Sequence, residues 1–188
     1  MHVQNKLLVV GGATRNVGKT TFVVNIIKKF SPKFSVVALK IKTLRTNDTF
    51  FHGKDRNPLK ENEPYRITEE THEGNEDTER MFSAGAERVF KIKAKVDYLH
   101  TAFLDFSERI KGNSLIVCES NSLFEFVKPD LFLFIKMKDS DTMKPSAKKL
   151  YKLADKVILS DGKNYDFDVK ALNFSEKREK WELDLPNL

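Results

Sequence analysis

The chain has little cysteine and no long apolar run. Cys118 is the only cysteine among 188 residues, so the chain alone forms neither an internal disulfide nor a cysteine-based zinc site. No stretch approaches the roughly 20 apolar residues that a membrane-spanning helix needs. The apolar run at 7–10 is too short for the core of a secretion signal. We therefore expect a cytoplasmic protein in which Cys118 is a buried, unreactive strand residue.

The rest of the composition is that of a globular protein with a heavily charged surface. Hydrophobic residues make up 40% of the chain, charged residues make up 32%, and the formal net charge is +6. A length of 188 residues suits one α/β domain with its own core. The positive net charge favours anionic ligands such as nucleotides. Because acidic and basic residues are interspersed without an arginine-rich block, we expect neither nucleic acid nor a membrane as the partner.

A glycine-bearing loop near the N-terminus carries the most specific pattern. The apolar residues 7–10 predict a buried strand, and the sequence Gly-Lys-Thr-Thr at 18–21 opens a helical pattern. A phosphate-binding P-loop has a glycine, four further residues, and then Gly-Lys-Ser/Thr. Here Ala13 stands at the first glycine position, and alanine is the smallest substitute for glycine. Strand, loop and helix together predict a P-loop that binds a nucleoside triphosphate.

Each part of this loop has an expected role. Backbone N–H groups cradle phosphate oxygens, and the dipole of the following helix favours their negative charge. We expect Lys19 to reach the β- and γ-phosphates and to act in catalysis, and the Thr20 hydroxyl to ligate Mg²⁺. The side chain of Arg15 could lie over the phosphates, contact a neighbouring subunit or point into solvent, and the sequence leaves these alternatives open. The predicted nucleotide-binding residues of the loop are Ala13, Thr14, Arg15, Asn16, Val17, Gly18, Lys19, Thr20 and Thr21.

Apolar runs alternate with helical periodicities along most of the chain. Strands that are apolar on both faces, separated by helices, predict a mostly parallel sheet covered on each side. We therefore expect an α/β, three-layer P-loop NTPase fold with ligands at the carboxyl edge of its strands. The expected strands are 6–11, 34–42, 88–92, 114–119, 130–137 and 156–160, and the expected helices are 18–30, 77–84, 96–111 and 144–154.

The segment 43–76 interrupts this rhythm. It is rich in acidic residues and has few apolar anchors, and such a long stretch without clear elements is commonly functional. We interpret it as a charged insert in a single domain that spans 1–188, and its residues 48–55 as a β-hairpin or a lid over the ligand. The end of the chain, 173–188, holds the only tryptophan, Trp181, which we expect to pack as part of a covering tail.

A carboxylate ends the apolar strand at 114–118. In P-loop proteins an acidic residue in this place typically helps to hold Mg²⁺ or orients a nucleophile. We therefore expect Glu119 to be a metal ligand and a catalytic residue. Residues 120–122 (Ser-Asn-Ser) are expected either to donate hydrogen bonds to phosphate or substrate, or to cap a short helix at 123–127.

Lysines end the second expected strand. Lys40 and Lys42 share one face of it because side chains alternate along a strand, so they are expected to bind a substrate anion or the γ-phosphate, or to be solvated. Asp48, a few residues later, is a candidate to touch Mg²⁺ through water or to activate a nucleophile. His52 and His72 match no metal-ligand spacing, and we expect both to be exposed loop residues.

These residues resemble the molybdopterin-guanine dinucleotide biosynthesis protein B family (MobB). Only the P-loop at 13–21 is a specific part of the likeness, which covers most of 6–160. Shorter similarities are Leu-Lys-Ile-Lys at 39–42, Asp-Thr-Glu-Arg at 77–80 leading into Ala-Gly-Ala at 84–86, and the strand into Glu119. The resemblance implies a GTP- and Mg²⁺-binding, often dimeric protein of the signal-recognition/MinD-type P-loop class. It also implies a role in attaching a nucleotide to molybdopterin.

Departures from MobB leave the base and the substrate open. Thr-Leu-Arg at 43–45 replaces the family's histidines, and Ser120 follows Glu119 where the family has glycine. The guanine signature Asn-Lys-x-Asp is absent, and Asp-Gly-Lys-Asn at 161–164 is only a loose substitute. The bound nucleotide is therefore either ATP or GTP.

Two alternative functions stay open at this point. The loop is also similar to that of dethiobiotin synthetase, which shares the Val-Gly-Lys-Thr ending and a lysine at the end of its second strand. That similarity implies an ATP-dependent ligase or kinase acting on a small carboxylate or amine. The non-enzymatic alternative is a nucleotide-gated adaptor, in which the segment 43–76 changes shape with the γ-phosphate and signals to a protein partner.

Overall fold

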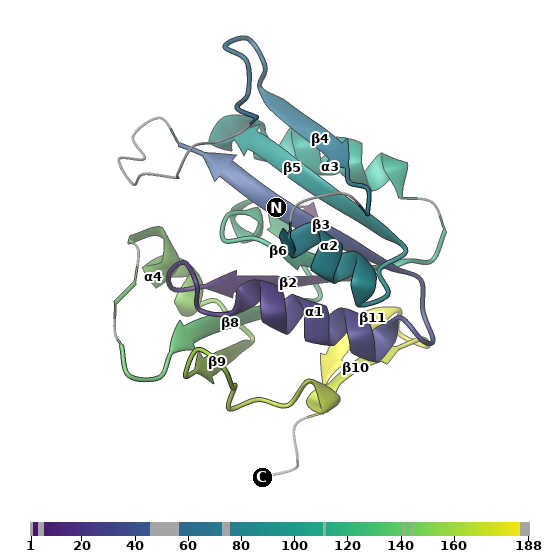
Figure 1. Ribbon diagram of the computed structural model, residues 1–188, viewed down its shortest axis with the longest axis vertical. Helices are drawn as coiled ribbons and strands as arrows, with labels where there is room; N and C mark the ends of the chain where they lie inside the picture. The colour runs from purple at the N-terminus through teal and green to yellow at the C-terminus, as the bar shows by residue number, and fades with distance from the viewer. Residues whose placement is uncertain are drawn as a thin grey trace.

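A seven-stranded sheet forms the centre of the protein (Figure 1). The computed structural model describes residues 2–3, 6–45, 57–72, 76–110, 112–140, 142–143 and 145–184. The strand order is β4-β5-β3-β6-β2-β8-β9, and only β4 runs antiparallel to its neighbour. The strands are β2 (Leu7–Gly12), β3 (Val36–Leu44), β4 (Tyr65–Glu69), β5 (Arg88–Lys95), β6 (Leu115–Glu119), β8 (Leu131–Met137) and β9 (Lys156–Ser160).

Helices cover both faces of this sheet. Helices α1 (Lys19–Phe30) and α2 (Glu76–Ser83) lie on one face, and α3 (Leu99–Arg109) and α4 (Pro145–Tyr151) lie on the other (Figure 1). The prediction of a three-layer α/β fold with a mostly parallel sheet is confirmed. The smaller elements are β1 (His2–Val3) paired with β7 (Val127–Lys128), the hairpin of β10 (Leu172–Ser175) and β11 (Lys180–Leu183), and the short 3₁₀ helices η1 (Val96–Tyr98), η2 (Leu123–Glu125) and η3 (Val169–Ala171).

Strand β2 shows how the two cores are built. All six of its residues are buried, and alternate side chains enter opposite layers. Leu8 and Val10 pack in the core that contains the apolar side of α1, whereas Leu7 and Val9 pack with α3. Cys118 on the neighbouring β6 is fully buried, and this burial raises the pKa of its thiol well above the ordinary value. The predicted inert cysteine is thus confirmed to be a core residue.

The largest differences from the expected elements fall on weakly apolar segments. Strand β4 lies within 43–76 but beyond the hairpin or lid expected at 48–55, which falls outside the described residues. The residues of β4 are half-buried or exposed because it is the edge strand of the sheet. Strand β5 continues to Lys95, three residues beyond the expected end at 92. The helix expected at 96–111 divides into η1 and α3.

The end of the chain packs on α1. Trp181 on β11 is 2% exposed and makes edge contacts with Phe30 and Phe174, with ring centroids 4.6 and 5.8 Å apart. The hairpin therefore adds an aromatic cluster to the layer that contains α1, in line with the covering role expected for Trp181.

The described part of the chain contains no helix that is both long and apolar enough to cross a membrane.

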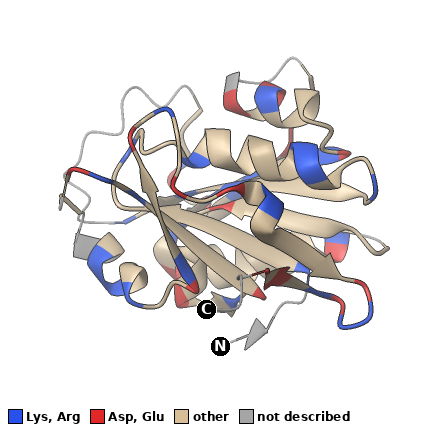
Figure 2. Ribbon diagram, turned by 90° about the horizontal axis from the view of Figure 1, so that it is seen from below, with Lys and Arg blue, Asp and Glu red and all other residues tan. Residues whose placement is uncertain are grey.

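Lysine and arginine residues are interspersed with aspartate and glutamate residues over the elements visible in Figure 2.

Candidate phosphate-binding site

The loop between β2 and α1 presents the amino end of a helix to solvent. Asn16 and Gly18 have positive φ angles of 60° and 91°, and α1 begins at the next residue, Lys19. The first intrahelical bond runs from the Phe22 N–H to the Gly18 carbonyl at 3.0 Å. The preceding N–H groups of α1 therefore have no acceptor within the helix, and the positive end of its dipole points at the loop.

Two side chains from distant elements hold this loop in place. The Asn121 amide, just after β6, accepts from the Gly12 N–H at 2.7 Å and donates to the Gly12 carbonyl at 2.9 Å. The Tyr165 hydroxyl, after β9, donates to the Gly18 carbonyl at 2.7 Å. The loop is thus fixed at both of its ends, by a residue that follows the neighbouring strand β6 and by one that follows the edge strand β9.

Glycine is required at both of these contacts. A Cβ at Gly12 would lie 2.8 Å from Val17 and 2.9 Å from the Lys19 side chain, which crosses directly over it. A Cβ at Gly18 would lie 2.5 Å from the Tyr165 hydroxyl, and the positive φ there is itself unfavourable for other residues. Lys19 then turns back over the loop and donates to the Thr14 carbonyl at 3.0 Å.

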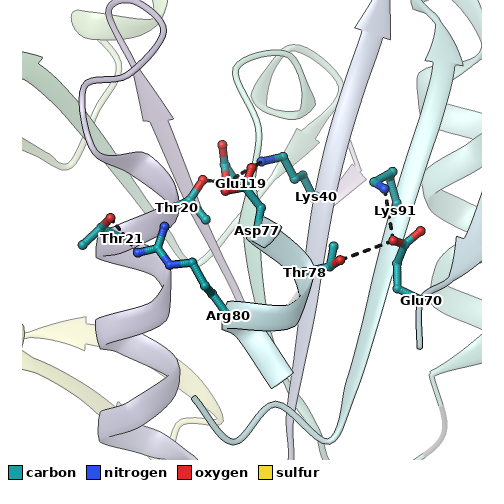
Figure 3. Close-up of polar contacts among 9 residues, drawn as sticks. All are labelled: Thr20, Thr21, Lys40, Glu70, Asp77, Thr78, Arg80, Lys91 and Glu119. Carbon is teal, nitrogen blue, oxygen red and sulfur yellow. Dashed lines mark hydrogen bonds and ion pairs between the residues drawn. The ribbon is translucent and has the colours of Figure 1, made fainter. Parts of the chain in front are cut away.

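Four charged or polar side chains meet beside the loop (Figure 3). The Thr20 hydroxyl donates to Glu119 Oε2 at 2.7 Å, and the Lys40 ammonium lies 3.4 Å from the same oxygen. Lys40 also pairs with Asp77, the second residue of α2. Because β3 and β6 are parallel neighbours with Lys40 opposite Glu119, the sheet register itself brings this lysine to the carboxylate.

A cavity of about 540 Å³ opens over this group. It is lined by residues of the loop, of the start of α1, of the end of β3 and of α2. Basic side chains dominate its lining, with five of them against two carboxylates, so the cavity favours an anion. The lining residues are Arg15, Asn16, Gly18, Lys19, Thr20, Thr21, Lys40, Ile41, Lys42, Asp77, Arg80, Glu119 and Gly162.

The predicted residues divide into those that line the cavity and those that support it. Ala13 and Val17 are 2% and 1% exposed and point into the cores. The Ala13 N–H also donates to the Ile135 carbonyl at 2.9 Å, which extends the pairing of β2 with β8. Thr14 offers its carbonyl to Lys19. Neither Ala13, Thr14 nor Val17 is among the described lining residues, whereas the six other predicted loop residues and Lys40 are.

Of the three residues after Glu119, Ser120 takes the capping role. Ser120 Oγ accepts from the N–H groups of Ser122 and Leu123 at 3.1 Å each, at the start of η2. Asn121 binds the loop backbone, as described above. Asp48 and His52 lie outside the described residues. His72 stacks on Phe82 with ring centroids 4.3 Å apart.

The donor atoms present suit Mg²⁺ bound together with phosphate. The described residues contain no group of three or more His, Cys, Asp or Glu side chains able to hold a metal by themselves. Mg²⁺ in nucleotide sites usually takes one or two protein oxygens and completes its shell with phosphates and water. The Thr20 hydroxyl and the Glu119 carboxylate, 2.7 Å apart, are hard oxygen donors of that kind, so they fit this metal.

The sequence alone did not assign Asp77, Arg80 or Tyr165 to the site. Asp77 and Arg80 lie three residues apart on α2 and both line the cavity. Arg80 Nη2 donates to the Thr21 hydroxyl at 2.8 Å. Burial raises the pKa of Tyr165, and the positive charge of Arg80 opposes that rise. Two signals were available for Asp77 and Arg80: their part in the MobB resemblance, and their spacing, which places both side chains on the same helical face.

Comparisons with models of protein families, with curated proteins and with solved structures find no match for this chain.

Proposed function

We propose that the protein binds a Mg²⁺-nucleoside triphosphate, ATP or GTP, in this cavity and hydrolyses it slowly. The observation that carries the proposal is the Thr20–Glu119 pair at 2.7 Å, located beside Lys19 at the amino end of α1. A hydroxyl, a carboxylate and a lysine in this arrangement supply the groups that a Mg²⁺-bound polyphosphate needs.

Each side chain has a role that follows from its position. When a nucleotide binds, Lys19 gives up its hydrogen bond to the Thr14 carbonyl and contacts the β- and γ-phosphates instead. Glu119 orients the Thr20 hydroxyl, and Lys40 offsets the negative charge of Glu119 until phosphate arrives. When bound, Mg²⁺ would neutralise charge that develops on the β- and γ-phosphate oxygens. Asp48 stays a prediction as a second catalytic carboxylate.

The biological role that we propose is MobB-like. It would be cytoplasmic and would serve nucleotide attachment in molybdenum cofactor synthesis or in a related cofactor pathway, with a homodimer or a protein partner as the working form. The support for this role is the resemblance in the P-loop and at 39–42, 77–80 and 84–86.

The shape of the cavity also supports a second candidate function. Its lining continues from the P-loop to Lys40, Ile41 and Lys42 on β3. The two lysines are basic groups in addition to those with which a P-loop binds phosphate. An ATP-dependent ligase or kinase would place a small carboxylate there. Product formation from ATP and a small carboxylate or amine would favour this candidate, whereas turnover that stays at background would favour the nucleotide-gated adaptor.

The central test is Lys19→Ala with Lys28→Ala as its control. Lys28 is an exposed lysine near the other end of α1, so both variants remove one charge from the same helix. We expect Lys19→Ala to weaken Mg²⁺-dependent nucleotide binding by about a hundredfold or more, because a charge-assisted contact to phosphate is lost. Lys28→Ala should bind like the wild type. Calorimetric titration measures the affinities, and circular dichroism verifies the fold; unchanged affinity in Lys19→Ala would reject the proposal.

The base can be identified by a thermal-shift panel. A ligand that binds only the folded state stabilises it by RT ln(1 + [L]/Kd). ATP, GTP and their diphosphates should therefore be compared with and without Mg²⁺. The correct triphosphate should give the largest shift, and that shift should depend on Mg²⁺.

A further inference from the structure

Arg80 has no carboxylate partner among the described residues, in contrast to four other arginines of the protein. Arg45, Arg66, Arg88 and Arg178 each form an ion pair with a glutamate. Arg80 instead donates from Nη2 to a neutral hydroxyl, that of Thr21, at 2.8 Å. Within the described part of the chain no carboxylate pairs with its guanidinium. Its charge is therefore available to an anion in the cavity that it lines.

The position of Arg80 is unfavourable unless an anion binds there. Thr21 is the third residue of α1, so the guanidinium lies over the first turn of that helix. The amino end of a helix carries a partial positive charge, and a cation beside it is repelled. Arg15 and Lys19 line the same cavity and add to the repulsion. A bound phosphate would offset this repulsion, because its negative charge attracts the helix end and each of these side chains.

The geometry also indicates which phosphate Arg80 would meet. Thr20 and Thr21 are successive helical residues, so their side chains point in directions about 100° apart. Thr20 faces Glu119 and Lys40, whereas Thr21 faces Arg80 (Figure 3). If the loop binds a nucleotide as P-loops do, the Thr20 hydroxyl would hold Mg²⁺ together with the β- and γ-phosphates. Arg80 therefore lies nearest to the end of the polyphosphate that is farther from Glu119, which is the end with the α-phosphate.

We infer that Arg80 binds the α-phosphate of the nucleotide and that α2 thereby spans the polyphosphate, with Asp77 near its γ end and Arg80 near its α end. This inference rests on the proposed nucleotide binding. It assigns two separate recognition tasks to the cavity. Lys40 contacts the γ-phosphate, which only triphosphates have. Arg80 contacts the α-phosphate, which diphosphates and triphosphates share.

The test compares Arg80→Met with Lys40→Met for binding of GTP, GDP, ATP and ADP in Mg²⁺, with calorimetry as the measurement. Arg80→Met should weaken the triphosphate and the diphosphate of the preferred base by the same factor, about tenfold to a hundredfold, since a charged hydrogen bond is lost from both. Lys40→Met should weaken the triphosphate alone. Arg109→Met is the matched control, because Arg109 is exposed on α3 across the sheet, and it should change neither affinity.

Other results would overturn the assignment. A loss confined to triphosphates in Arg80→Met would place Arg80 at the γ-phosphate. Unchanged affinities with a lower melting temperature would make the Arg80–Thr21 contact purely structural. If Arg80→Met does not fold, Arg80→Lys keeps the charge and the stem but not the fork of donors, and it should show a smaller, equal loss for both nucleotides. Wild-type protein that binds no nucleotide would instead reject the proposed function itself, a result independent of Arg80.

Discussion

Two clusters of the same residue types lie on one face of the sheet (Figure 3), and the first of them lines the cavity described above whereas the second does not. In the first, Glu119 Oε2 accepts from Thr20 at 2.7 Å and lies 3.4 Å from Lys40. In the second, Glu70 Oε2 accepts from Thr78 at 3.3 Å and lies 3.1 Å from Lys91. We call them the loop cluster and the edge cluster.

The burial of the glutamate and of the lysine does not distinguish the two clusters. The side chains of Glu119 and Glu70 are 10% and 11% exposed, and those of Lys40 and Lys91 are 24% and 26% exposed. The difference lies in the backbone that carries the threonine. Thr20 is at the amino end of α1 beside the P-loop, whereas Thr78 is fully buried where α2 packs near the antiparallel edge of the sheet. The two clusters therefore share their side-chain chemistry and differ in the open, electropositive helix end that lies beside the loop cluster.

Substitution of the two glutamates should give the largest difference in nucleotide affinity between the clusters. Glu119→Gln should weaken Mg²⁺-dependent triphosphate binding by about tenfold to a hundredfold, because a charged oxygen next to the metal becomes neutral. Glu70→Gln should leave this affinity unchanged. Both substitutions should lower the free energy of unfolding by about 1–3 kcal/mol, since each removes charged hydrogen bonds of the same kind.

Calorimetry with a Mg²⁺ titration measures the affinity, and urea unfolding measures the stability. An equal effect of Glu119→Gln and Glu70→Gln on affinity would contradict the distinction between the two clusters.

The lysines offer a finer comparison. Lys40→Met should reduce the preference for triphosphate over diphosphate by about tenfold, because a contact to the γ-phosphate is lost. Lys91→Met removes an equally buried lysine from the edge cluster and should preserve the preference. The ratio of the two dissociation constants in each variant is the quantity to measure, and a changed ratio in Lys91→Met would show that general electrostatics, not contact, sets the preference.

The smallest expected effect is on stability, and it comes from loss of the Tyr165 hydrogen bond that holds the loop beside the loop cluster. Tyr165→Phe removes the hydrogen bond to the Gly18 carbonyl and should lower stability by about 1 kcal/mol. For a chain of this size that is a fall of roughly 2–4 °C in the melting temperature. The edge cluster has no contact with Tyr165 among the described bonds, so hydrogen exchange should accelerate in the loop at 13–18 and not in β4. Acceleration in both regions would show that the clusters are not independent.

The parts of the fold that sequence patterns predicted are those with strong local signals. Strands β2, β6 and β8 are apolar runs buried on both faces, and α1 follows a spaced motif with a defined geometry. Strand β4 has the half-exposed sequence Tyr-Arg-Ile-Thr-Glu, and only its pairing with β5 makes it a strand. Local pattern carries no information about such long-range pairing.

The candidate site divides in the same way. Lys19, Thr20, Glu119 and Lys40 were predicted because each belongs to a motif or ends an apolar strand. Arg80 enters the cavity only because α2 packs across α1. The two Thr–Glu–Lys clusters contain the same residue types, and in the sequence the loop cluster differs by the Gly-Lys-Thr motif that contains Thr20.

The hydrogen bonds of Asn121 and Tyr165 to the two ends of the loop between β2 and α1 have a consequence for how a ligand would bind. Because Gly12 and Gly18 are already fixed in the folded chain, the loop loses its conformational freedom during folding and not on ligand capture. A preorganised receptor of this kind retains more of its interaction energy as affinity. Capture and release of successive ligands can then proceed without the loop melting and re-forming in each cycle.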